Sequence, residues 1–100
     1  MFKITNGKGF HITFPNGVTV SVQFGVANYC ANYPTLILTD ITSESIKQAE
    51  AGSHDAEIAI WDKDGNWITK KFKQNEDNII GYQSPNDLLK ILIWAEQYKK

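Results

Sequence analysis

The sequence predicts an α+β fold, in which an antiparallel β-sheet of about five to six strands, built from two hairpins, packs against a C-terminal α-helix. Apolar and polar residues alternate through residues 10–24, and residues 56–72 form a second stretch whose apolar residues fall on both faces of a hairpin; each stretch contains a glycine-containing turn. A capped, largely apolar segment follows at residues 85–98. The 100 residues are expected to form a single globular domain, residues 1–100, large enough to bury a core.

The alternation in the first hairpin also predicts its register. Apolar residues occupy every second position on both sides of the turn Pro15-Asn16-Gly17. A two-residue loop would set Phe14 opposite Thr19 and mix the faces, whereas a three-residue loop sets Phe14 opposite Val18. The longer loop also pairs two further apolar positions, Ile12 with Val20 and Phe10 with Val22. We therefore expect one apolar face, with Gly17 in the left-handed conformation of a bulged turn.

A second hairpin is predicted over residues 56–72, around a loop of residues 63–65. That loop would pair Asp62 with Asn66, Trp61 with Trp67 and Ile60 with Ile68. The resulting face is mainly apolar, although Lys70 then falls opposite Ile58. Shorter patterns predict strands at residues 1–6, 36–38 and 79–82, an ordered loop at 25–34 and a brief helix at 44–51.

The last helix has a clear start. Ser84 is the expected N-cap, Pro85 suits the first helical position, and Asp87 complements the positive end of the helix. The natural core face consists of Leu88, Ile91, Leu92 and Ala95. Three further apolar residues, Leu89, Ile93 and Trp94, must pack elsewhere in the fold or against another subunit. The helix therefore either lies in a groove of the fold or forms the contact of a homodimer.

Composition and charge limit the classes of function. The formal net charge is −1, with ten lysines, eleven acidic residues and no arginine. Because arginine is the usual reader of guanine edges and phosphates, its absence argues against sequence-specific nucleic-acid binding. The longest largely apolar stretch, residues 88–95, is too short for a membrane span of roughly 20 residues. The single cysteine and the polar turn at Asn6 favour a cytoplasmic protein without a signal peptide.

Motifs that would carry chemistry are weak. Cys30 could act as a nucleophile only beside an imidazole, and nothing in the spacing brings His11 or His54 to it. Residues 62–66 begin like a calcium loop, but the required glycine and the closing acidic residue are missing. We therefore expect no catalytic residue, no bound metal and no cofactor.

A recognition surface is the stronger candidate. The irregular loop combines phenol and amide groups, which supply contact area and adaptable hydrogen bonds. Two tryptophans of the second hairpin extend such a surface if the C-terminal helix covers the opposite face of the sheet, and otherwise they belong to the core. The predicted partner-binding residues are Asn28, Tyr29, Asn32, Tyr33, Trp61 and Trp67.

Several segments resemble small phage- and prophage-encoded proteins of unassigned function. These segments are residues 7–14, 16–17, 20–25, 28–30, 59–61 and 81–85. The resemblance covers most of the chain and carries no catalytic motif. It implies a small accessory protein made during infection, a group that includes anti-CRISPR and other anti-defence inhibitors.

The residues and the resemblance together predict a non-catalytic binding protein, a phage-encoded inhibitor of a host defence complex that acts by protein–protein occlusion. Its partner would be a host or phage protein. Two alternatives stay open. Tyrosine stacking, lysines and asparagine amides would suffice to sequester a small nucleotide-like ligand, and Cys30 would serve a cysteine-dependent enzyme.

Overall fold

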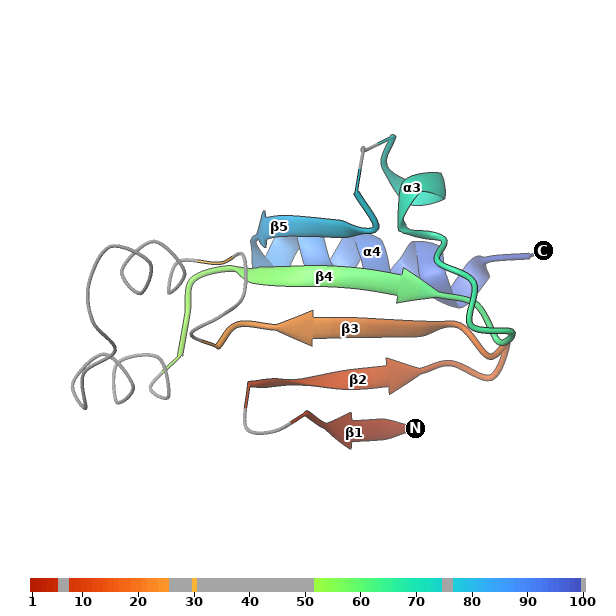
Figure 1. The fold of residues 1–100 in the computed structure, drawn as a ribbon, viewed down its shortest axis with the longest axis horizontal. Coiled ribbons are helices and arrows are strands. Elements are labelled where there is room, and N and C mark those ends of the chain that lie inside the picture. The colour runs from red at the N-terminus through yellow and green to blue at the C-terminus, as the bar shows by residue number, and fades with distance from the viewer. Residues whose placement is uncertain (6–7, 26–29, 31–51, 75–76, 100) are drawn as a thin grey trace.

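The computed structural model describes residues 1–5, 8–25, 30, 52–74 and 77–99 (Figure 1). Its elements are β1 (Phe2–Ile4), β2 (Gly9–Thr13), β3 (Thr19–Gln23), β4 (Ala56–Trp61), α3 (Thr69–Phe72), β5 (Ile79–Gln83) and α4 (Pro85–Gln97). The five strands form one open antiparallel sheet in the order β1-β2-β3-β4-β5. The predicted α+β class is therefore confirmed. The strand predicted at 36–38, the helix at 44–51 and most of the loop at 25–34 lie outside the described residues.

The first hairpin has the predicted register and turn. Phe10 pairs with Val22 and Ile12 with Val20. The N–H of Phe14 donates to the carbonyl oxygen of Val18 at 2.9 Å, which closes the three-residue loop. Gly17 has φ +84°, the left-handed conformation that an L side chain rarely adopts. Alternation and turn chemistry were therefore sufficient to predict this hairpin.

The second hairpin keeps its predicted turn but loses its predicted return strand. Trp61 and Trp67 form an antiparallel bridge, and the N–H of Ile68 donates to Ile60 at 2.9 Å. The chain then turns into α3. The Thr69 hydroxyl accepts the N–H of Ile60 at 2.9 Å and donates to the carbonyl oxygen of Ile60, so a side chain bonds to the backbone groups that a return strand would have paired with. The prediction of a strand through residues 69–72 is wrong.

Strand β5 takes the place that the return strand would have filled. Ile80 lies opposite Ile58 in the β4–β5 pair, so an apolar residue stands where Lys70 was expected. A β-bulge follows, and Tyr82 in it has φ +57°. Because Ile80 and not Lys70 lies opposite Ile58, the expected lysine charge does not interrupt the apolar face.

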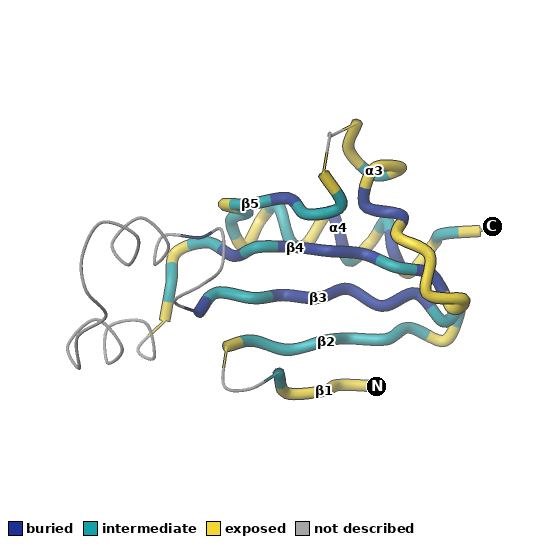
Figure 2. The backbone as a smooth tube through the Cα atoms, in the orientation of Figure 1, coloured by how far each residue is buried: buried dark blue, intermediate teal, exposed yellow. Residues whose placement is uncertain are grey.

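One face of the sheet is packed against α4, which lies behind β4 and β5 in the view of Figure 1 and also contacts β3. Figure 2 shows the buried residues concentrated along β3 and β4, whereas β1 is exposed. The buried cluster consists of Val18, Val20, Val22, Ala56, Ile58, Ile60, Ile68, Ile91 and Ala95. Every second residue of the strands thus meets the inner stripe of one helix.

Helix α4 begins as predicted. The Ser84 hydroxyl accepts the N–H of Asp87 at 3.1 Å, and the Asp87 carboxylate accepts the N–H of Ser84 at 2.9 Å. This capping box lowers the pKa of Asp87, chiefly because the backbone N–H of Ser84 stabilises the charged form.

The other end of α4 is closed by a residue from the first hairpin turn. The Asn16 Nδ2 group donates to the carbonyl oxygens of Ala95 at 2.9 Å, Glu96 at 3.2 Å and Tyr98 at 3.2 Å. Its Oδ1 accepts the N–H of Val18 at 3.0 Å. A side chain predicted only to shape a turn therefore also caps the helix and anchors it to the sheet.

The three apolar residues of α4 outside its predicted core face differ in their burial. Trp94 packs within the fold, edge to face with Phe72 and tilted on Tyr98. Leu89 is 57% exposed, and Ile93 is also exposed. The described part of the chain has no helix long and apolar enough to cross a membrane.

Candidate binding surface

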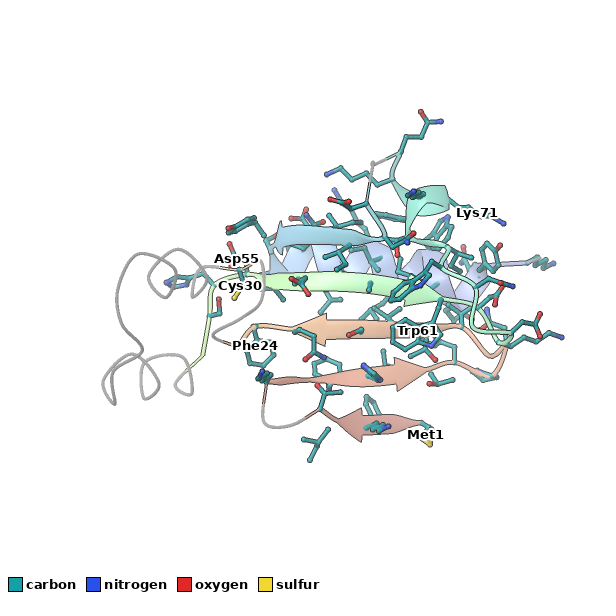
Figure 3. The ribbon with its side chains drawn as sticks, in the orientation of Figure 1. Met1, Phe24, Cys30, Asp55, Trp61 and Lys71 are labelled. Carbon is teal, nitrogen blue, oxygen red and sulfur yellow. The ribbon has the colours of Figure 1, made fainter. Side chains whose placement is uncertain are left out.

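The structure separates the two groups of predicted binding residues. Asn28, Tyr29, Asn32 and Tyr33 lie outside the described residues. Trp61 and Trp67 are described. Trp61 lies on the sheet face that α4 leaves open (Figure 3), and its bridge partner Trp67 lies on the same face. Because the helix covers the opposite face, the condition for a tryptophan surface is met.

The open face carries a row of three aromatic rings, His11, Trp61 and Trp67, which we call the aromatic row. His11 and Trp61 meet edge to face with ring centroids 5.0 Å apart. Trp61 and Trp67 meet in the same way at 5.4 Å. Trp67 is 51% exposed, whereas the other two rings are partly buried. The row therefore ends in a large ring that is supported on one side and accessible on the other.

Backbone alternation explains why the row lies on this face. Ile58 and Ile60 point into the core, so Ala59 and Trp61 between and beside them point to the open side. Ser21 lies opposite both His11 and Ala59 in the register. The small side chains of Ser21 on β3 and Ala59 on β4 leave room for the Trp61 indole and the His11 imidazole.

His11 was not among the predicted site residues. Its contact with Trp61 joins strands β2 and β4, which the sequence separates by more than forty residues. No local pattern signals such a contact.

The pKa of His11 is lowered from 6.5, first because partial burial disfavours the charged imidazolium and second because Lys3 is near. Lys3 lies directly opposite His11 in the β1–β2 register. The neutral imidazole is therefore favoured, and it presents an uncharged ring to Trp61.

Polar side chains around the aromatic row are occupied with one another. The Gln23 Nε2 group donates to Thr5 Oγ1 at 2.7 Å and to Ser21 Oγ at 3.2 Å. The hydroxyls of Thr13 and Thr19 share a hydrogen bond at 2.8 Å. Among the described residues, no buried side-chain nitrogen or oxygen lacks a partner. The hydroxyl and amide groups beside the aromatic row are therefore already bonded within the sheet.

The sites considered for chemistry are closed or incomplete. Cys30 is fully buried, and its thiol donates to the carbonyl oxygen of Gly25 at 3.6 Å. The Asp62 Oδ1 atom accepts the N–H groups of Asp64 and Asn66, each at 2.9 Å, which is an Asx turn and not a set of outward ligands. Within the described ranges, no group of three metal-binding side chains comes together.

A pocket of about 220 Å³ lies at the other end of the sheet, between the start of β4 and the start of α4. Its lining is mainly apolar and includes Phe24, Ala56, Pro85 and Leu88. His54 and Asp55 also line it, and the Asp55 carboxylate accepts a long hydrogen bond from Ser53 at 3.4 Å.

Comparison with protein-family models, with curated proteins and with solved structures found no match for this chain.

Proposed function

We propose that this protein is a non-catalytic binding protein that recognises another protein through the aromatic row on the open face of its sheet. The observation that carries the proposal is Trp67, half exposed and held edge to face by Trp61, on a face that no described helix covers. Tryptophan side chains in such settings dominate protein–protein binding energies, because they bury a large area at a small entropic cost.

The support beneath the row favours recognition over a merely solvent-facing tryptophan. Trp67 follows a turn whose backbone is closed by hydrogen bonds from Asp62 to Asn66 and from Gly65 to Asp62, at 2.9 and 3.0 Å. The ring is therefore held in place before a partner arrives. Preorganisation of this kind lowers the entropic cost of binding.

The resemblance to small phage proteins supports a more specific form of the proposal. In that form, the partner is a component of a host defence complex, and the protein inhibits the complex by occluding one of its contact surfaces. An inhibitor of this type needs a stable fold and one exposed recognition patch. It needs no catalytic residue.

The test is affinity purification of the tagged protein from host lysate, with and without infection, followed by native mass spectrometry. Trp67→Ala should reduce the captured polypeptide at least tenfold, because loss of a hot-spot tryptophan costs about 2 kcal/mol or more. Leu89→Ala is the matched control, since Leu89 has a similar exposed fraction but lies on α4, behind the sheet. Its capture should be unchanged.

Three results would overturn the proposal. Capture that survives Trp67→Ala would remove the aromatic row from the interface. Equal loss in both variants would point to unfolding or to the α4 surface. Retention of a small ligand of a few hundred daltons, with no polypeptide, would replace protein binding with ligand sequestration.

A further inference from the structure

We propose that the outer edge of β1 accepts an extended segment of a partner protein as an additional strand of the sheet, and that this segment carries an acidic residue between apolar residues. The site borders the aromatic row, because Lys3 lies opposite His11, but none of its residues belongs to the row. Phe2 and Ile4 contribute outward backbone groups and apolar side chains, and Lys3 contributes a positive charge.

The hydrogen bonds between β1 and β2 show which backbone groups are free. Thr13 donates to the carbonyl oxygen of Met1 at 2.8 Å, and Thr5 donates to that of Gly9 at 3.1 Å. Residues 1, 3 and 5 therefore direct their backbone groups towards β2, and Phe2 and Ile4 direct theirs outwards. Among the described residues, no strand pairs with that outer side. An edge of this kind is a template for another strand.

The side chains beside these groups are apolar and exposed. Phe2 is 77% exposed and Ile4 is 81% exposed. They lie opposite Ile12 and Phe10, which pack against the core, so they continue the helix-side face of the sheet. Helix α4 packs against β3 and β5 and leaves this end of the face uncovered (Figure 2). Apolar residues of an added strand would bury this surface.

The two edges of the sheet differ in protection. The edge formed by β5 is distorted, because the β-bulge and the positive φ of Tyr82 interrupt regular pairing there. Strand β1 contains neither a proline nor a bulge. An incoming strand would therefore meet regular backbone geometry only at β1.

The positive charge of Lys3 determines which kind of strand would pair with β1. Lys3 lies between the two apolar residues and on the opposite face of β1, across from His11. The first 39 residues of the chain include no acidic residue. A second copy of β1, paired so that Phe2 faces Ile4, would set two Lys3 side chains opposite each other, and like charges in that position destabilise a sheet. An acidic residue opposite Lys3 would stabilise the pair, which favours a partner segment of alternating apolar and acidic residues.

The experiment uses the full chain and a short synthetic peptide of alternating valine and glutamate, with a valine–lysine peptide as the matched control. Amide hydrogen exchange is followed by NMR. The glutamate peptide should slow exchange at Phe2 and Ile4 at least tenfold and leave the already bonded Lys3 amide unchanged. The lysine peptide should have no effect.

Variants of β1 test the backbone and the charge separately. Ile4→Pro removes an outward N–H together with the isoleucine side chain and should abolish peptide binding, while Ile4→Ala removes the side chain but keeps the N–H and should retain most of the binding. Lys3→Glu should reverse the preference, so that the lysine peptide binds at least tenfold better than the glutamate peptide. Trp67→Ala should leave peptide binding unchanged, which separates this proposal from that of the aromatic row.

Several outcomes would overturn the inference. Equal binding of the two peptides, or no change of preference in Lys3→Glu, would exclude the acidic segment. Protection of Phe2 and Ile4 that rises with protein concentration in the absence of peptide would assign the edge to a second copy. No protection by either peptide would remove β1 as a docking edge.

Discussion

Alternate residues of the same strands face opposite sides of this sheet, and the two sides differ in what lies against them. On the helix side, Val20, Ile58 and Ile60 are fully buried beneath α4. On the open side, the neighbouring positions hold Ser21, Ala59 and Trp61, and the largest accessible ring is Trp67. The pleat of the strand thus separates the side chains that form the core from those of the proposed recognition surface.

The separation follows from where apolar area is removed from water. Burial of aliphatic side chains against α4 stabilises the fold at roughly 25 cal/mol per Å². The open face contributes less, since its hydroxyl and amide groups bond to one another and its aromatic row stays partly accessible. Substitutions on the two faces should therefore have different consequences.

The largest effect is expected from truncation on the helix side. Ile58→Ala should lower the free energy of unfolding by about 2–5 kcal/mol, because it leaves a cavity in a fully packed core. Trp67→Ala, on the open side, should lower it by about 1 kcal/mol or less. Denaturant unfolding followed by circular dichroism measures both. Equal losses would show that the open face is as important for folding as the core.

A smaller loss is expected when α4 is detached from the hairpin turn. Asn16→Ala leaves the carbonyl oxygens of the last helical turn without their shared donor, and should cost about 1–3 kcal/mol. Hydrogen exchange should accelerate at the C-terminal end of α4 and stay unchanged at Ser21 on β3.

Asn66→Ala is the matched control, because it makes the same change in the other hairpin turn. There the amide donates only to Asp62, at 3.3 Å, and the residue is exposed. A loss as large as that of Asn16→Ala would contradict the capping role of Asn16.

The smallest expected effect concerns the titration of His11. Its pKa is lowered in the folded protein, so its contribution to stability is fully present above the unfolded value of 6.5 and is lost as the pH falls through the lower folded value. Lys3→Ala removes the second cause and should move the pKa of His11 towards 6.5. NMR titration of the imidazole protons measures the change.

Lys8→Ala serves as the control for that titration. Lys8 is also a lysine beside β2, but it is not a source of the shift. An equal rise in both variants would mean that general charge, and not the facing Lys3, acts on the imidazole.

The parts of the fold that could be predicted are those with local physical causes. The register of the first hairpin followed from alternation and from the three-residue turn, and the start of α4 followed from Ser84, Pro85 and Asp87. The turn around Gly65 was predicted for the same reason. In each case the deciding interactions join residues only a few positions apart.

The errors and omissions have non-local causes. The return strand at residues 69–72 is wrong because the Thr69 hydroxyl occupies Ile60 and because β5 pairs with β4 instead. The capping of α4 by Asn16 and the contact of His11 with Trp61 join residues far apart in the sequence. Residue propensities and sequence periodicity describe neighbouring positions and cannot predict contacts between distant ones.

The sequence by itself determined which residues of each strand share a face, where the turns fall and where the last helix begins, since these depend on alternation, backbone conformation and capping. Only the tertiary structure decided which face α4 covers, and hence that Trp67 is accessible and that His11 supports the aromatic row. It also decided that β1 is an edge with outward backbone groups. These properties depend on the spatial order of strands, which long-range pairing sets and which no single segment encodes.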